Sequence, residues 1–172
     1  MDADFFLVQK MKNGDEDAVE TFVRKYYPVI LKYCNYHTWD RQEAEDLTQE
    51  TFMRFFASLG GYRHRGKAVH YLYVIAGNLC RDSRRGRTEL PFEDLSDIAE
   101  DPIEQAEERL QIEAALQKLP QELQEVIILH YFQNLKLKEI AEILQIGLPL
   151  VKYRTGRAKK EMKKYLGEED VT

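Results

Sequence analysis

Apolar residues recur at three- and four-residue intervals along most of this chain, which is the spacing of amphipathic helices. The spacing fades once, over residues 87–102, where the sequence is acidic and contains two prolines. Nine Gly and five Pro among 172 residues leave little material for the turns of an all-β fold. The sequence therefore predicts an all-α fold with an N-terminal helical bundle over 1–88, an acidic linker over 89–108 and a small helical domain over 109–172.

The distribution of charge follows the same division. Residues 89–113 hold ten Asp and Glu and one Arg, whereas the regions on either side each carry a net charge of +2. Residues 152–164 are strongly basic, with Glu161 as their one acid. Because the whole chain has a net charge of −5, this unevenness favours nucleic-acid contact at particular patches over indiscriminate binding of polyanions. From charge alone, a solvated helix face explains the basic run equally well.

Three helices account for the central part of the first domain. An inner row at helical spacing predicts the first of them: Ala18, Phe22, Tyr26, Ile30 and Tyr33. Pro28 lies inside this row and is expected to kink or restart the helix. The second helix is predicted from about 41 to 59, ending at Gly60-Gly61, and the third from 67 to 85. Further helices are predicted from Pro102 to about 118, then over 121–133, 136–144 and 148–165.

The last two predicted helices form a helix-turn-helix pattern. A short turn is expected over 145–147, and Pro149 suits the first turn of the next helix. Val151 follows Ala141 by ten residues, the position at which a helix-turn-helix needs an apolar residue to anchor its second helix on the first. With Val151 inward, five side chains can project toward phosphates and base edges in a major groove: Lys152, Tyr153, Arg154, Arg157 and Lys160. An ordinary amphipathic hairpin has a similar pattern, but the local basic excess favours DNA binding.

Aromatic, cationic and amide residues alternate between residues 60 and 87. This composition suits single-stranded nucleic acid, because rings stack on bases, cations follow phosphates and an amide can read a base edge. It also suits a pocket for an extruded base. The candidate residues are Tyr62, Arg63, His64, Arg65, Asn78, Arg81, Arg84 and Arg85. A role in the core is the alternative for aromatics here, and it is expected for Tyr73 more than for Tyr62 and His64, which lie in a predicted loop.

Motifs of catalysis are missing from the sequence. It contains neither a Gly-rich phosphate loop nor a nucleophile elbow, so we expect no enzyme, no catalytic residue and no cofactor. Cys34 and His37 could supply two metal ligands, but no second pair has suitable spacing, so no metal is expected. The two cysteines fit a reduced cytoplasmic protein. Without a signal-peptide pattern or a long apolar run, we expect no direct membrane insertion.

Three segments, taken together, resemble a known family. EAEDLTQETFMRFF over 43–56, HYLYVIAGNLCRDSRR over 70–85, and the stretch from LPQELQEV to KKEMKKYL over 119–166 stand in one order along the chain. In content, order and spacing they resemble bacterial extracytoplasmic-function sigma factors, which are small two-domain promoter-recognition subunits of RNA polymerase. Each motif is weak by itself, whereas the ordered set covers nearly the whole chain.

The resemblance implies roles for particular residues. It implies that Asp46, Gln49, Glu50, Phe52 and Arg54 bind polymerase. It implies that Tyr62 and Asn78 line the pocket for an extruded base of the −10 element, with the loop 61–67 selecting that base. By the same resemblance, the five outward residues of the last helix contact the −35 element, and the acidic linker threads polymerase channels that otherwise hold nucleic acid.

The resemblance also implies partners. They are the RNA polymerase core, through the clamp helices of its largest subunit and the flap of its second largest, together with promoter DNA and an anti-sigma factor. Such a factor would hold the protein at the inner face of the membrane. Two other functions fit the helical pattern: a stand-alone helix-turn-helix regulator whose N-terminal bundle serves dimerisation or sensing, and an adaptor that binds proteins and no DNA.

Overall fold

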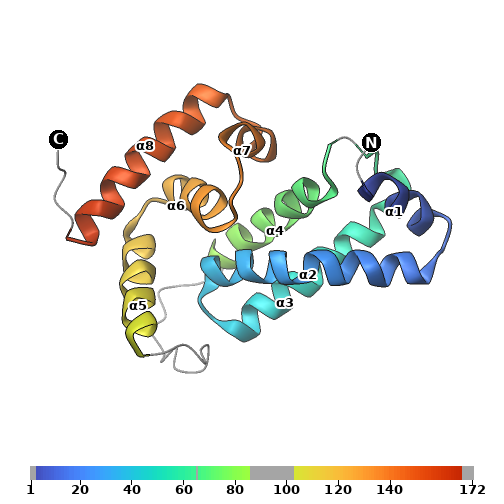
Figure 1. The fold of residues 1–172 in the computed structure, drawn as a ribbon, viewed down its shortest axis with the longest axis horizontal. Coiled ribbons are helices and arrows are strands. Elements are labelled where there is room, and N and C mark those ends of the chain that lie inside the picture. The colour runs from blue at the N-terminus through green and yellow to red at the C-terminus, as the bar shows by residue number, and fades with distance from the viewer. Residues whose placement is uncertain (1–2, 65, 86–102, 168–172) are drawn as a thin grey trace. The chain divides into compact units, whose positions relative to one another are not determined.

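The computed structural model describes residues 3–64, 66–85 and 103–167 (Figure 1). Every regular element within these ranges is helical, which confirms the predicted all-α fold. The chain separates into two compact units, Met1–Glu93 and Asp94–Thr172. Most of the predicted linker 89–108 lies outside the described residues, although helix α5 already begins at Ile103. The predicted domain boundaries at 88 and 109 therefore stay predictions.

Over residues 3–64 and 66–85, the N-terminal unit contains four α-helices and one short 3-10 turn. They are α1 (Ala3–Lys12), α2 (Glu16–Thr38), α3 (Arg41–Ala57), η1 (Leu59–Gly61) and α4 (Ala68–Arg85). The helices α2, α3 and α4 pack against one another, and α1 lies across one end of α2 (Figure 1). This arrangement buries one stripe of each long helix and leaves the loop between η1 and α4 at the edge of the bundle.

Aromatic rings fill the core of this unit. All five residues of the predicted inner row of α2 are buried. Phe22 stacks on Phe55 of α3 with ring centroids 4.9 Å apart, and Tyr33 meets Tyr73 of α4 edge-on at 5.2 Å. Paired rings of this kind add to the burial of their own large apolar area. The interior of the N-terminal unit is therefore fixed by contacts between residues far apart in the sequence.

The helices α2 and α3 differ from the sequence-based predictions. The helix α2 continues through Pro28, so the predicted restart there is wrong. Pro28 lies on the exposed side of the helix, where water can reach the carbonyl group that has lost its amide partner. The helix α3 ends at Ala57, two residues early, because the chain tightens into the 3-10 turn η1 before Tyr62.

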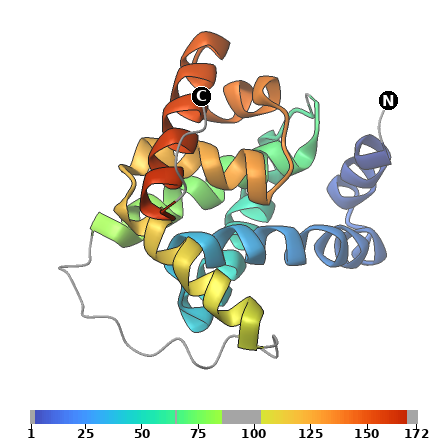
Figure 2. The same cartoon turned by 60° about the vertical axis from the view of Figure 1, so that its left-hand side comes forward.

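The C-terminal unit contains α5 (Ile103–Lys118), α6 (Gln121–Ile127), the π-helical turn η2 (Ile128–Phe132), α7 (Leu137–Leu144) and α8 (Leu148–Tyr165). The predicted break at Leu119-Pro120 separates α5 from α6, and the single helix predicted over 121–133 is α6 followed by η2. The core of the C-terminal unit includes Leu116, Val126, Leu129, Ile140 and Val151. Figure 2 shows α7 beside α8; α8 also packs against α6, and α7 packs against η2, so the remaining side of α8 faces away from the core of this unit.

Candidate nucleic-acid and protein interfaces

The helix-turn-helix is built as the sequence predicts. Gln145 ends α7 in the left-handed region with φ of 54°, and its N–H donates to the carbonyl of Ala141. Gly147 then precedes α8, with Pro149 in the first turn. Val151 is fully buried and anchors α8 on the inner side. The turn therefore fixes which side of α8 faces away from the core.

The outer side of α8 is cationic and carries one exposed ring. Val151, Thr155, Ala158 and Met162 form the buried stripe. The predicted residues Lys152, Tyr153, Arg157 and Lys160 are all exposed, and Tyr153 has 60% of its surface accessible. Arg157 Nη1 donates to the Tyr153 hydroxyl at 3.1 Å, and this hydrogen bond raises the pKa of Arg157. Together these four residues define the outer face of α8, a surface suited to phosphates and base edges.

Arg154 is the exception among the predicted residues of α8. Its side chain is only 23% exposed, and its Nη2 lies 3.8 Å from Oε2 of Glu122 on α6. Arg154 is thus half-buried and leans toward α6, whereas its four predicted neighbours are exposed, and its contact with the −35 element stays a prediction. Glu122 is well exposed, so this long ion pair is weak and water competes for both groups.

Tyr62 lies at the centre of the candidate loop in the N-terminal unit. Its ring stacks on Tyr71 with centroids 5.3 Å apart and lies 5.5 Å from the ring of Phe55. Its hydroxyl shares a hydrogen bond of 3.1 Å with Nδ1 of His64. The hydroxyl group of Tyr71 in turn shares a hydrogen bond of 3.2 Å with the hydroxyl group of Ser58. The half-buried ring of Tyr62 is thus held by α3 and α4 while one part stays accessible.

The remaining candidates of this region divide into three groups. Arg63, on the loop, and Asn78, on α4, are exposed, and Arg81 donates a hydrogen bond to the Asn78 side-chain oxygen. Arg84 is half-buried. Arg65 and the side chain of Arg85 lie outside the described residues. The structure therefore brings Tyr62, Arg63 and His64 together on one loop and Asn78 and Arg81 together on α4.

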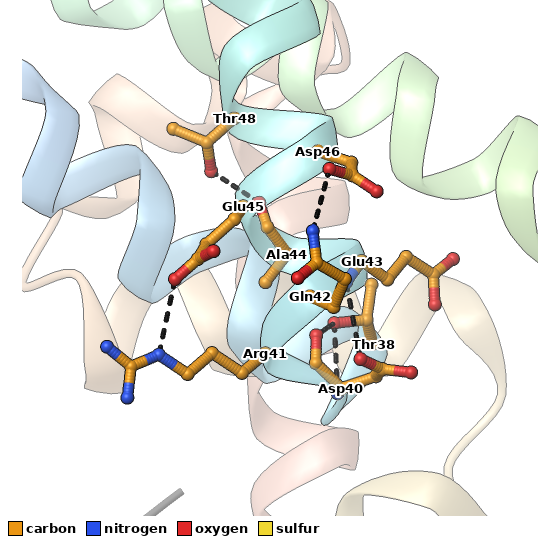
Figure 3. Close-up of polar contacts among 9 residues, drawn as sticks. All are labelled: Thr38, Asp40, Arg41, Gln42, Glu43, Ala44, Glu45, Asp46 and Thr48. Atoms are coloured by element: carbon orange, nitrogen blue, oxygen red, sulfur yellow. Dashed lines mark hydrogen bonds and ion pairs between the residues drawn. The ribbon is translucent and has the colours of Figure 1, made fainter.

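The beginning of α3 is well capped (Figure 3). The Asp40 carboxylate accepts from the backbone N–H of Glu43 at 3.2 Å, and the Thr38 hydroxyl donates to the Asp40 carbonyl at 3.1 Å. Ser83 of α4 donates to the carboxylate of Glu43, which ties the two helices together. A carboxylate cap typically stabilises a helix by about 1 kcal/mol. The cap fixes where α3 starts and hence which of its side chains face outward.

A polar row with an apolar residue in it occupies the outer side of α3. Gln42 donates to Asp46 at 3.1 Å (Figure 3), and Arg54 pairs with Glu50 at 3.0 Å. Met53 is 66% exposed on the same side. Four predicted polymerase-binding residues have accessible side chains here: Asp46, Gln49, Glu50 and Arg54. We call these four residues and Met53 the outer row of α3.

Phe52 does not belong to that row. It is only 5% exposed and packs between Phe22 and Tyr27 of α2, so its predicted contact with a partner is corrected to a role in the core. Met53 is the residue that the sequence-based prediction missed. The sequence contained a signal for the exposure of Met53. The α-helical period places position 53 on the same side as positions 46 and 49, so a large apolar side chain faces outward there.

The comparisons with known proteins match both units. The family model described as Sigma-70 region 2 matches residues 22–89, and Sigma-70 region 4 matches residues 109–162. The RNA polymerase sigma-H factor of Pseudomonas aeruginosa is 32% identical, over 93% of this chain and 92% of its own length. The ECF RNA polymerase sigma factor SigW of Bacillus subtilis is 30% identical, over 92% and 94%. This chain belongs to the ECF sigma factors.

Solved structures share the fold of this sigma factor. CnrH, in its complex with the cytosolic domain of CnrY, superposes with a TM-score of 0.80 at 22% identity, covering 96% of this chain and 98% of its own. RpoE of Bartonella quintana, solved with the anti-sigma factor NepR, has a TM-score of 0.67 at 18% identity, over 87% and 96%. At these identities the likeness concerns the fold alone.

Family membership bears on the remaining predictions about this sigma factor. Sigma factors bind the RNA polymerase core and serve as its DNA-recognition subunits, so this chain is not an enzyme. Within the described ranges, no helix has the length and apolar character needed to cross a membrane. Nor do three His, Cys, Asp or Glu side chains meet there as a set of metal ligands.

Proposed function

We propose that this sigma factor directs RNA polymerase core to specific promoters and helps to initiate transcription by recognising their −10 and −35 elements. One observation carries the proposal: the region 2 and region 4 matches coincide with the units that hold the loop of Tyr62 and the outer face of α8. A stand-alone helix-turn-helix regulator is less favoured, because the N-terminal bundle matches region 2 rather than a bundle for dimerisation or sensing.

The N-terminal unit captures a base of the −10 element as the duplex opens. The half-buried ring of Tyr62 offers an aromatic contact for the base, and the exposed amide of Asn78 offers hydrogen bonds to a base edge. Positive charge for the DNA phosphates comes from five arginines, Arg63, Arg65, Arg81, Arg84 and Arg85. The contacts of Tyr71 and Phe55 with the ring of Tyr62 support this role, because a ring that is already ordered loses less entropy when a base binds.

The outer row of α3 binds polymerase through the clamp helices of the largest subunit. Its mixture of carboxylates, an amide and an exposed methionine supports a protein partner, since such surfaces combine a flexible apolar contact with a polar rim. The C-terminal unit contacts the flap of the second largest subunit. With the protein held at both ends, the outer face of α8 lies in the major groove of the −35 element through Lys152, Tyr153, Arg157 and Lys160.

An anti-sigma factor holds this protein inactive. Support comes from the two similar solved structures, in which CnrH is bound to the cytosolic domain of CnrY and the sigma factor RpoE is bound to the anti-sigma factor NepR. The protein works in the cytoplasm, where the polymerase is, and an anti-sigma factor in the membrane would keep it at the inner face until release.

In vitro transcription with purified core polymerase on genomic fragments tests this proposal. We expect start sites that share sequence elements near −10 and −35 and that are absent without the protein. Asn78→Ala should reduce open-complex formation while leaving affinity for core unchanged, and Gln49→Ala should weaken affinity for core. Each variant is the control for the other. Specific DNA binding without polymerase, and no specific transcription with it, would favour the stand-alone regulator.

A further inference from the structure

The helix α1 is firmly attached to the N-terminal unit, although none of the surfaces described above uses it. Its Val8 and Met11 are buried. Asp4, also buried, accepts hydrogen bonds from the Tyr26 hydroxyl and, at 2.8 Å, from Lys25 Nζ on α2. A carboxylate buried against α2 and hydrogen-bonded twice fixes both the position and the rotation of α1. Side chains that α1 presents elsewhere are therefore held in defined places.

Two of those side chains reach the loop of Tyr62 from about fifty residues away in the sequence. Lys12, at the end of α1, donates from its ammonium group to the backbone carbonyl of Tyr62. The ring of Phe5 lies with its centroid 6.2 Å from that of His64. His64 is the residue that shares a hydrogen bond with the Tyr62 hydroxyl. The helix α1 thus contacts Tyr62 directly at the backbone and indirectly through the partner of its hydroxyl.

These contacts restrain the backbone of the loop, in addition to the contacts that hold the ring of Tyr62. Tyr71 and Phe55 fix the ring of Tyr62, whereas the backbone beyond it runs through the exposed residues Arg63, Gly66 and Lys67. Gly66 has φ of 78°, a backbone conformation that glycine adopts without strain. A charged donor on the Tyr62 carbonyl limits the rotation of the peptide group that leads into this segment.

We propose that α1, through Lys12 and Phe5, is a positioning element for the loop 61–67 and thereby sets how sharply the protein discriminates among bases at the −10 element. The proposal rests on the proposed function of that loop. Lys12 acts on Tyr62 rather than on DNA. A phosphate contact by Lys12 would strengthen binding to all sequences alike, whereas positioning changes the ratio between preferred and other bases.

The test uses holoenzyme assembled from the full chain and a promoter library randomised through the −10 element. Transcripts are sequenced to obtain the ratio of preferred to other bases at each position. Lys12→Met removes the donor and keeps the length of the side chain. We expect it to lower that ratio by about three- to tenfold at the positions read by the loop, the effect of one hydrogen bond at an exposed position. Affinity for core, the salt dependence of promoter binding and the midpoint of thermal unfolding should stay unchanged.

Two matched variants make the result specific. Lys10→Met removes an equal charge from an exposed position of the same helix and should leave the base ratio unchanged. Lys12→Arg keeps a cationic donor and should restore most of the discrimination. An unchanged base ratio in Lys12→Met, or an equal loss in Lys10→Met, would overturn the positioning role while the proposed function stands. A wild-type holoenzyme without any base preference would overturn the proposed function, and the positioning role with it.

Discussion

The two candidate DNA-binding surfaces of this sigma factor are built in opposite ways. The outer face of α8 consists of residues from one helix, and its internal contact joins Arg157 to Tyr153 four positions earlier. The loop of Tyr62 depends on contacts from α1, α3 and α4, the longest of which join residues fifty or more positions apart. A surface on one helix follows from helical periodicity, whereas a loop held by three helices follows from the packing of a whole unit. Mutations in the core should therefore affect the loop far more than they affect α8.

The strongest test of this comparison removes a ring that belongs both to the core and to the loop. Phe55 is fully buried, stacks on Phe22 and contacts Tyr62. Phe55→Ala should lower the free energy of unfolding of the N-terminal unit by about 3–5 kcal/mol, because it leaves a cavity where three rings meet. Urea unfolding followed by circular dichroism measures this loss.

The control for that variant is Phe6→Ala, which truncates a ring that is 59% exposed on α1. It should change the free energy of unfolding by no more than about 0.5 kcal/mol. In Phe55→Ala holoenzyme, recognition of the −10 element should fall while binding of an isolated −35 duplex stays the same. Equal losses at both elements would show that the two surfaces are not independent.

A buried carboxyl group makes the C-terminal unit sensitive to pH. Burial in α5 raises the pKa of Glu113 from 4.5 to about 7, against the opposing effect of the nearby Arg109 charge. With this group the folded state binds more protons than the unfolded state between these values, so the contribution of Glu113 to stability should be greatest below about pH 5 and fall as the pH rises to about 7. The difference amounts to at most roughly 3 kcal/mol.

Glu113→Gln removes this titration and isolates the effect. The variant should match the wild type near pH 4.5 and unfold at higher urea concentration at pH 8, since Gln carries no charge that burial would penalise. Urea titrations of both proteins across that range, monitored in the C-terminal unit, provide the measurement. Parallel pH profiles for the two proteins would mean that Glu113 stays ionised in the folded state.

Two arginines of α8 allow a comparison between an exposed cation and one that is paired with a carboxylate. Arg157 is exposed on the outer face, whereas Arg154 lies toward Glu122. Arg157→Ala should weaken binding of the −35 duplex by roughly tenfold and lower the slope of log affinity against log salt by about 0.9, as one lost phosphate contact does. Arg154→Ala should change the slope by less. Fluorescence anisotropy over a salt series measures both, and the reverse ranking would reassign the contacts.

The smallest expected effect concerns the one glycine inside α8. A Cβ at Gly156 would meet no atom within 4 Å beyond its chain neighbours and the nearby backbone of its own helix, and the backbone there is helical. Gly156→Ala should therefore stabilise the C-terminal unit by about 0.5–1 kcal/mol, because alanine loses less backbone entropy in a helix. Thermal unfolding measures the gain. Loss of affinity for the −35 duplex in the stabilised variant would show that DNA approaches α8 closely at this position.

Sequence reasoning succeeded where a residue's environment depends on its own helix. The inner row of α2 and the turn before α8 were predicted correctly, because helical period, a left-handed cap and a proline in a first turn are local features. It missed the burial of Phe52 and the turn of Arg154 toward α6, because both depend on the neighbours that each helix meets. Position 52 faces the rings of α2, and position 154 faces Glu122 of α6.

By itself, the sequence determined the helical fold, the succession of two helical regions with an acidic stretch between them, and the cationic side of the last helix. Each of these is set by local spacing or by charge counts, which do not depend on how helices pack. Only the tertiary structure decided that α1 reaches the loop of Tyr62, that Tyr71 and Phe55 hold its ring, and that Met53 rather than Phe52 is exposed. Such contacts arise when rigid helices bury their apolar stripes together, and the partner that each side chain then meets is fixed by the geometry of that packing.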